Sequence, residues 1–285
     1  MQIGLNIFAL NGKLGPDSLE NVMYELKKRK ITYIEVCTIA PIPENSNQLF
    51  AEAEAEATAR FGMPPGLVKG RDIFKKIEDV RKTGMNVCSC HILMANVYPE
   101  YVQDAVPYMK EIHEKAGISQ FVISCMFDSV EKAESFAPYI QAAAKELKSD
   151  NIDLCYHNHE MDCQPLENGS NAMQMLLSLC PDLKFQPDTG WAWFGGMDAA
   201  SFIRENKDRI MSVHLKDMII DPDNRIHFKA VGTGSANSAA CIEAAKQLDL
   251  APGKLMIDND DSDRDLYDDI EDSVEFILDS FAIKQ

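Results

Sequence analysis

The chain alternates between short apolar runs and longer segments whose apolar residues recur at helical spacing. Between Leu19 and Leu26, for example, Val22 and Met23 complete a stripe with the three- and four-residue intervals of one helix face. The short runs predict eight strands, over 3–10, 32–37, 86–91, 120–126, 152–157, 183–187, 210–215 and 254–258. The segments between them predict helices, from Ser18 and over 70–83, 100–116, 129–149, 171–179, 198–207, 236–248 and 266–282.

This alternation is typical of parallel strands joined by helical crossovers, and therefore of the α/β class. Eight such units predict a single (β/α)8 TIM barrel over residues 1–285, since barrels of this kind need about 250 residues. The alternative is an open, doubly wound sheet. That fold carries a glycine-rich phosphate-binding turn after its first strand, and no such turn follows residues 3–10.

One segment breaks the regular spacing, between the second strand and its helix. Residues 38–68 contain an alternating Ala–Glu run over 51–57, flanked by prolines. Alanine and glutamate favour a helix, although Glu52 and Glu56 repel each other at i,i+4. We expect an inserted helical excursion at the mouth of the barrel, either a lid or a solvated surface helix.

Charge and hydropathy narrow the classes of partner. The formal net charge of −17 repels nucleic acid and anionic membrane surfaces. No apolar run is long enough to span a bilayer. The first ten residues lack the basic region and cleavage site of a signal peptide, so we expect a cytoplasmic protein, although a leader removed earlier would leave the same pattern.

The eight cysteines show neither metal-site nor disulfide-framework spacing. Several lie inside apolar runs, where a reduced cysteine acts as a small hydrophobic residue. We expect free core thiols in a reducing compartment.

Candidate chemistry lies at the ends of the fifth to eighth strands. These four strands end in His157, Asp188, His214 and Asp258, and a barrel gathers such strand ends around one rim. Two imidazoles and two carboxylates that converge there predict a site for one divalent metal ion. Mixed nitrogen and oxygen ligands suit manganese, zinc, cobalt or iron better than calcium.

Further polar residues point to the same rim. Asn6, Glu35 and His91 belong to the ends of the first three strands and are candidates for substrate binding. His159 follows His157 by two residues, on the same side of an extended chain but farther out, where it could meet a substrate. Lys216 stands in the same relation to His214.

Two candidate substrate contacts lie in loops. Trp191 could stack against the C–H groups of a sugar, or it could belong to a loop packed on helix tops. Gly232 and Gly234 follow the seventh strand, where barrels often bind phosphate through backbone N–H groups. Two glycines are a weak signal, so the phosphorylation state of the substrate stays open.

Three runs carry a resemblance to a known family. They are His157-Asn158-His159-Glu160, Asp188-Thr189-Gly190-Trp191 and His214-Leu215-Lys216-Asp217. As an ordered set they resemble the sugar isomerase/epimerase superfamily of xylose-isomerase-like barrels, which includes inosose dehydratases and ketose 3-epimerases. The likeness extends over essentially the whole chain.

The resemblance implies a single divalent metal ion held by strands five to eight, usually through Glu, Asp, His and Glu. Asp188 and His214 match this pattern, whereas His157 replaces a glutamate and Asp258 is one methylene shorter than the usual residue. An imidazole in place of a carboxylate shifts the preference away from magnesium. Two alternatives remain: Glu160 or Asp162 replaces His157 as ligand, or the affinity for metal is weak or lost.

A metal ion beside bases implies chemistry next to a carbonyl. We expect proton abstraction to give an enediolate, with His159 as the base, Glu160 as a second acid or base and Lys216 near the developing oxyanion. Isomerisation or epimerisation of a sugar or polyol follows from return of the proton. Loss of a β-substituent from a keto-sugar, keto-inositol or 3-keto-glycoside would instead give a lyase or dehydratase.

Two other classes stay open. An abasic-site endonuclease shares this barrel in a sister family, but it needs three metal ions and a basic groove, which the acidic composition disfavours. A non-catalytic sugar-binding barrel would account for the altered ligands. Barrels of this kind often associate, and the sequence leaves homo-oligomerisation open.

Overall fold

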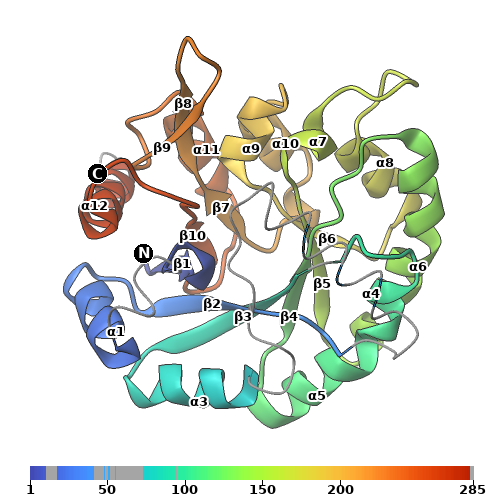
Figure 1. Cartoon of the computed structure of the whole chain (residues 1–285), viewed down its shortest axis with the longest axis horizontal. Helices are drawn as coiled ribbons and strands as arrows, with labels where there is room; N and C mark the ends of the chain where they lie inside the picture. The colour runs from blue at the N-terminus through green and yellow to red at the C-terminus, as the bar shows by residue number, and fades with distance from the viewer. Residues whose placement is uncertain are drawn as a thin grey trace. The chain divides into compact units, whose positions relative to one another are not determined.

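The protein is described by a computed structural model over residues 1–10, 18–41, 48, 51, 55, 73–93 and 95–282. Its main sheet has eight strands in the order β6-β5-β4-β3-β2-β1-β10-β7 (Figure 1). These strands are β1 (Ile3–Asn6), β2 (Tyr33–Thr38), β3 (Asn86–Ile92), β4 (Gln120–Ile123), β5 (Asp153–His157), β6 (Lys184–Gln186), β7 (Val213–Leu215) and β10 (Leu255–Ile257). The strand pairs β1–β10, β1–β2, β10–β7, β3–β4 and β4–β5 are all parallel.

The two strands at the ends of this order are joined to each other. Phe185 of β6 forms a parallel bridge with Ile210, and Asp188 forms another with His214 of β7. The N–H of Met211 donates to the carbonyl of Phe185 at 3.0 Å, in line with the first bridge. These bridges connect the first and last strands of the sheet, so the predicted (β/α)8 barrel is confirmed.

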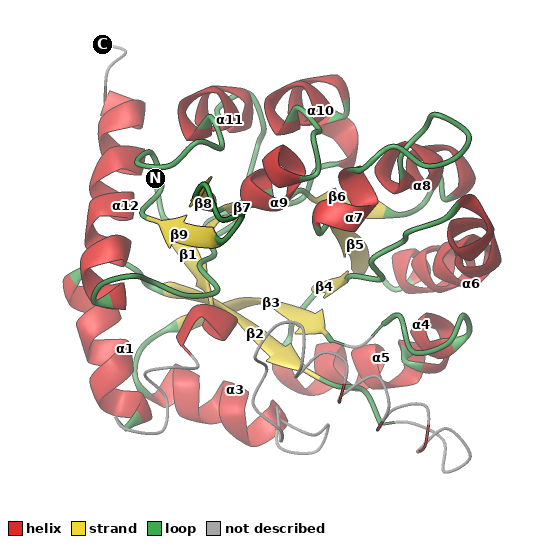
Figure 2. Cartoon of the chain, turned by 45° about the horizontal axis from the view of Figure 1, so that its top comes forward, coloured by secondary structure: helices red, strands yellow, loops and turns green. Residues whose placement is uncertain are grey.

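Helices separate the strands, as predicted. They are α1 (Leu19–Lys28), α3 (Ile73–Lys82), α4 (Tyr101–Asp104), α5 (Val106–Ala116), α6 (Val130–Ser149), α7 (Glu160–Cys163), α8 (Ala172–Leu179), α9 (Thr189–Phe194), α10 (Ala199–Glu205), α11 (Ser238–Ala245) and α12 (Leu266–Ala282). Figure 2 distinguishes these helices from the strands. Capping side chains define several helix starts: Ser18 accepts the N–H of Asn21 before α1, and Ser129 accepts that of Lys132 before α6.

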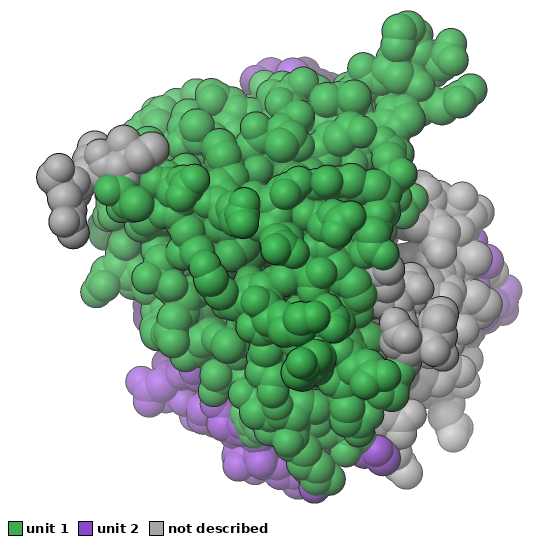
Figure 3. Space-filling model, turned by 90° about the vertical axis from the view of Figure 1, so that its left-hand side faces the viewer, with its two compact units in different colours: residues 1–36, 79–88, 185–285 green, residues 37–78, 89–184 purple. Residues whose placement is uncertain are grey.

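The chain divides into two compact units, coloured separately in Figure 3. Unit 1 consists of residues 1–36, 79–88 and 185–285, and unit 2 of residues 37–78 and 89–184. Each has an apolar core, with Leu5, Val213 and Ile257 fully buried in unit 1. In unit 2 the buried apolar residues include Phe121, Ile140 and Leu154.

Several details differ from the predicted elements. The first strand ends at Asn6 and continues as a short 3-10 helix, Ile7–Leu10. The long connection after β7 contains an antiparallel hairpin, β8 (Asp217–Ile220) and β9 (Ile226–Lys229), which was not predicted. The short helices α7 and α9 were also missed. The predicted excursion over 38–68 lies outside the described residues, except for 38–41, 48, 51 and 55.

All eight cysteines are free thiols, as predicted, with seven buried and Cys88 half-buried. Within the described part of the chain, no helix combines the length and apolar character that a bilayer crossing requires.

Candidate functional site

Asp188 lies two residues beyond β6, and each of its carboxylate oxygens contacts a different neighbour. Its Oδ1 atom accepts the N–H of Trp191 at 2.8 Å and so caps the start of α9. Its Oδ2 atom lies 3.6 Å from Nζ of Lys216. Burial raises the pKa of this carboxyl group to about 7, although the Lys216 charge acts in the opposite direction. The capping bond uses the first oxygen, and the second oxygen lies beside the Lys216 ammonium group.

His214 of β7 lies between two carboxylates. Its Nε2 atom is 3.1 Å from Oε1 of Glu35, and its Nδ1 atom is 3.0 Å from Oδ2 of Asp258, directly after β10. Burial lowers the pKa of His214, but the charges of Glu35 and Asp258 outweigh this effect and raise it to about 10. Both carboxylates therefore favour positive charge at this position.

Glu35 is held by amide side chains as well as by His214. Its oxygens accept Nδ2 of Asn6 at 3.0 Å and Nε2 of Gln186 at 2.8 Å, and Gln186 also donates to Ser212 at 2.9 Å. All of these residues are buried. Gln186 and Ser212 were missed, although each is a polar residue within an apolar run, which is the signal that could have identified them. In this structure Asn6 and Glu35 are parts of a buried polar network.

Lys216 is buried with its ammonium group among three carboxylates. Its Nζ atom lies 2.7 Å from Asp260, 3.2 Å from Asp258 and 3.6 Å from Asp188. Burial lowers the pKa of Lys216, but these three charges outweigh it and keep it above its usual range. Asp260 was missed by the sequence argument, because it lies beyond the strand end in an acid-rich loop.

Trp191 is buried in α9 and not in a loop. Its ring contacts Phe228 edge-on at 5.9 Å between centroids, and the Lys216 ammonium lies 5.0 Å from its centroid. These contacts agree with the interpretation that Trp191 is packed. Its predicted contact with a sugar stays a prediction.

In unit 2, three histidines form a row. The rings of His91 and His157 lie 5.3 Å apart, and those of His157 and His159 lie 5.2 Å apart. Nε2 of His91 is 3.1 Å from Oγ of Ser124. The predicted adjacency of His157 and His159 on one side of the chain is therefore observed.

Asp162 has a structural role that argues against the alternative in which it binds metal. One oxygen accepts the N–H of Phe127 at 2.8 Å and the hydroxyl of Tyr156 at 2.7 Å. The other accepts the N–H of His159 at 2.8 Å. Burial raises the pKa of Asp162 to about 6, despite these bonds. Both oxygens are thus used to shape the segment that carries His159 and Glu160.

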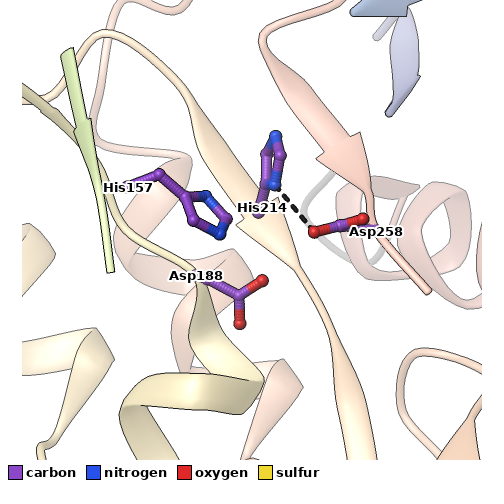
Figure 4. A group of neighbouring side chains, drawn as sticks. All are labelled: His157, Asp188, His214 and Asp258. Carbon is purple, nitrogen blue, oxygen red and sulfur yellow. Dashed lines mark hydrogen bonds and ion pairs between the residues drawn. The ribbon is translucent and has the colours of Figure 1, made fainter. Parts of the chain in front are cut away.

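Three of the four predicted metal ligands form a group within unit 1. Asp188, His214 and Asp258 are all buried, and each offers a ligand atom within 4.8 Å of the others (Figure 4). The fourth, His157, is buried in unit 2. The Oδ1 atom of Asp258 is buried and has no hydrogen-bond partner among the described residues. A buried carboxylate oxygen normally has a partner, and a bound cation would supply one. The nitrogen and oxygen donors of this group therefore fit a divalent cation.

Gly232 and Gly234 have a structural explanation. Their N–H groups donate to Oδ2 of Asp217 at 2.9 and 3.1 Å, and Ser238 donates to the same oxygen at 2.8 Å. The N–H of Ala236 donates to Oδ1 at 2.9 Å. A Cβ atom at Gly234 would lie 2.3 Å from Oδ1 of Asp217. The carboxylate therefore occupies the backbone donors that the sequence left open as a possible phosphate site.

Parallel (β/α)8 barrels that carry histidines and carboxylates at the carboxyl ends of their strands are typically enzymes, with the active site at that face. The chain belongs to the xylose isomerase-like TIM barrel family, whose model matches residues 115–279. The matched region runs from the end of α5 into α12. It includes all four predicted metal ligands.

Solved structures show the same fold at low sequence identity. A sugar phosphate isomerase/epimerase from Parabacteroides distasonis ATCC 8503 is 20% identical with a TM-score of 0.69, over 96% of this chain and 92% of that one. The probable 3-DHS dehydratase from Bacillus anthracis is 12% identical with a TM-score of 0.65, over 98% and 99%. An IOLI protein with a bound zinc atom is 12% identical with a TM-score of 0.62, over 99% and 98%. Comparison with curated protein sequences gives no match.

Proposed function

We propose that the protein is a divalent-metal-dependent sugar isomerase or epimerase that removes a proton next to a carbonyl group. The observation that carries this proposal is the buried group of one imidazole and two carboxylates in unit 1, with ligand atoms within 4.8 Å of one another. Similarity to structures named as sugar phosphate isomerase/epimerase supports the substrate class.

His157, Asp188, His214 and Asp258 would hold the ion. A bound divalent ion would supply Lewis-acid polarisation of a carbonyl and its adjacent hydroxyl group. The mixed nitrogen and oxygen donors favour Mn, Zn, Co or Fe over Mg or Ca. The zinc atom named in the IOLI structure is consistent with this preference.

The proton transfer is assigned to unit 2. His159 would take the proton from the carbon beside the carbonyl, and Glu160 would act as second acid or base. Asp162 fixes the backbone N–H of His159, so the base has a defined starting position. Return of the proton to the neighbouring carbon isomerises the sugar, and return to the opposite face of the same carbon epimerises it. Lys216 would stabilise negative charge on the substrate oxygen.

The substrate is proposed to be a small sugar or polyol. His91 would bind a hydroxyl group, Asn6 and Glu35 would act through His214, which Glu35 contacts, and Trp191 would border the sugar. Gly232 and Gly234 would line the site as part of the loop that Asp217 organises. Because Asp217 uses their N–H groups, this loop offers little support for a phosphorylated substrate.

Deuterium exchange tests the proposal. Protein stripped with a chelator and reloaded with Mn²⁺ would be incubated with ketoses and keto-inositols in deuterated water. We expect deuterium at the carbon beside the carbonyl, with the ion and not without it. The variant Asp188→Asn, which keeps the side-chain shape, is expected to lose both the ion and the exchange.

Other outcomes distinguish the alternatives. Release of water or an aglycone would identify a lyase or dehydratase, the reaction type named for the Bacillus anthracis structure. Sugar binding without exchange, by protein that takes up no ion, would contradict the proposal and indicate a binding protein. Tight, salt-sensitive DNA binding would instead support an endonuclease.

A further inference from the structure

The Lys216 ammonium contacts the same carboxylates that the proposed ion would use. Its Nζ atom lies 3.2 Å from Oδ2 of Asp258 and 3.6 Å from Oδ2 of Asp188. Both aspartates belong to the metal group of unit 1. An ammonium group and a divalent ion repel each other at short range in a buried site, so the two cations compete for these oxygens.

Lys216 is held in this position by its surroundings. The Thr189 hydroxyl donates to the Lys216 carbonyl at 3.0 Å and accepts the Lys216 N–H at 3.1 Å. A Cβ atom at Gly190 would lie 2.7 Å from Cγ of Lys216, so the glycine leaves space for the lysine stem. The rings of Trp191 and Phe228 lie 5.0 and 5.7 Å from the ammonium. These contacts to its backbone, its aliphatic chain and its ammonium group keep the charge of Lys216 close to the carboxylates.

Asp260 is the carboxylate that Lys216 does not share with the metal group. It makes the shortest ion pair of the three, at 2.7 Å, and its side chain is 25% exposed. Because Asp260 lies outside the group of metal ligands, it can keep the ammonium when an ion occupies Asp188 and Asp258.

We propose that Lys216 is a built-in cation that competes with the divalent ion for Asp188 and Asp258, and that Asp260 is the positioning residue that draws the ammonium away from them. The pair Lys216–Asp260 then sets the affinity for the ion. This inference rests on the proposed function only in that an ion binds the group.

Titration with Mn²⁺, with the free ion measured by electron paramagnetic resonance, tests the inference. The variants are Lys216→Met, Asp260→Asn and the double variant, with Asp261→Asn as the matched control. Asp261 is exposed and carries the same charge one residue away. Lys216→Met keeps an unbranched side chain, one heavy atom shorter, and removes the charge.

We expect Lys216→Met to bind Mn²⁺ more tightly by about tenfold, which corresponds to ~1.4 kcal/mol. Asp260→Asn should weaken binding clearly more than Asp261→Asn does, because the ammonium then relies on the metal ligands alone. In the Lys216→Met background, Asp260→Asn should have no greater effect than the control. Unchanged or weaker binding by Lys216→Met would overturn the inference, as would an equal Asp260 effect in both backgrounds.

Thermal unfolding separates this role from simple packing. In chelator, Lys216→Met should melt below the wild type, because Asp188 and Asp258 lose their positive neighbour, and Mn²⁺ should raise its melting temperature more than that of the wild type. An equal loss with and without Mn²⁺ would indicate packing alone and overturn the inference. If Lys216→Met does not fold, the Mn²⁺ affinities of Asp260→Asn and Asp261→Asn test the inference. Equal affinities would overturn it.

The two proposals fail differently. If the wild type and Lys216→Met both bind no Mn²⁺, the metal-dependent function fails and this inference fails with it. If the wild type binds Mn²⁺ and Lys216→Met binds no more tightly, only the inference fails. Binding by Lys216→Met alone would support the inference and show that the lysine blocks the ion.

Discussion

The Nδ1 atom of His214 lies 3.0 Å from Oδ2 of Asp258, although 44 residues separate them in the chain. The contact exists because β7 and β10 pair in parallel and His214 lies opposite Met256 in their register. Two residues after Met256, the chain leaves the strand and presents the aspartate to the imidazole. The same carboxylate contacts Lys216, so Asp258 balances two positive groups.

Asp258→Asn is expected to destabilise the protein in chelator. Removing one member of a buried charged network costs about 3–5 kcal/mol, because the remaining charges lose their partner. Urea unfolding of this variant and of the exposed control Asp261→Asn measures the difference. A loss no larger than that of the control would show that Asp258 is not the main counter-charge of His214 and Lys216.

His159→Ala is expected to lower turnover by about 10²–10⁴-fold, the usual contribution of a general base. Its metal content should equal that of the wild type, because His159 is not one of the four proposed ligands. Turnover and bound metal would be measured on the same samples. His113→Ala, which removes a histidine of α5, is the control and should keep its turnover. Full activity of His159→Ala would refute its assignment as the base.

Asp217→Asn is expected to destabilise the loop that contains Gly232 and Gly234. The carboxylate accepts four backbone N–H groups and one hydroxyl, and an amide nitrogen in place of either oxygen would face donors. The expected cost is about 2–4 kcal/mol, from lost bonds to a charged acceptor and unsatisfied donors. Chemical denaturation measures it, with the exposed Asp249→Asn as control. Equal stability of the two variants would contradict the bonding scheme.

The contacts of His227 predict a pH dependence in the β8–β9 hairpin. Its Nδ1 atom lies 3.1 Å from Asp263 and its Nε2 atom 3.2 Å from Asp221, and these hydrogen bonds raise the pKa of His227 above its usual 6.5. A folded-state pKa above the unfolded value means stabilisation that is complete below pH 6.5 and is lost as pH rises through the folded-state pKa. The stability difference between the wild type and His227→Gln should therefore shrink as pH rises. A His227 pKa at or below 6.5 in an NMR titration would contradict this.

The elements and strand ends could be predicted because their signals are local. Apolar periodicity located all eight barrel strands, and the polar residue after each of the later strands identified Asp188 and Asp258. The α9 helix was missed because its six residues include three aromatic residues, one glycine and one threonine, which have low helix propensity. It forms because the Asp188 carboxylate caps it and Trp191 is buried. The β8–β9 hairpin was missed because the connection after the seventh strand was interpreted as one long loop, although Ile226-His227-Phe228-Lys229 alternates apolar and polar residues.

The roles of Gln186, Asp217 and Asp260 could not be predicted, since each depends on a partner that is distant in the chain or on the path of a loop. A one-dimensional pattern states which residues are polar and which side of a strand they share. It does not state which donor meets which acceptor, because hydrogen bonds and ion pairs act over about 3 Å and depend on how separate strands are registered. The family, the barrel and the candidate ligands are therefore properties of the amino-acid order. The pairing of Lys216 with its three carboxylates is decided by tertiary packing.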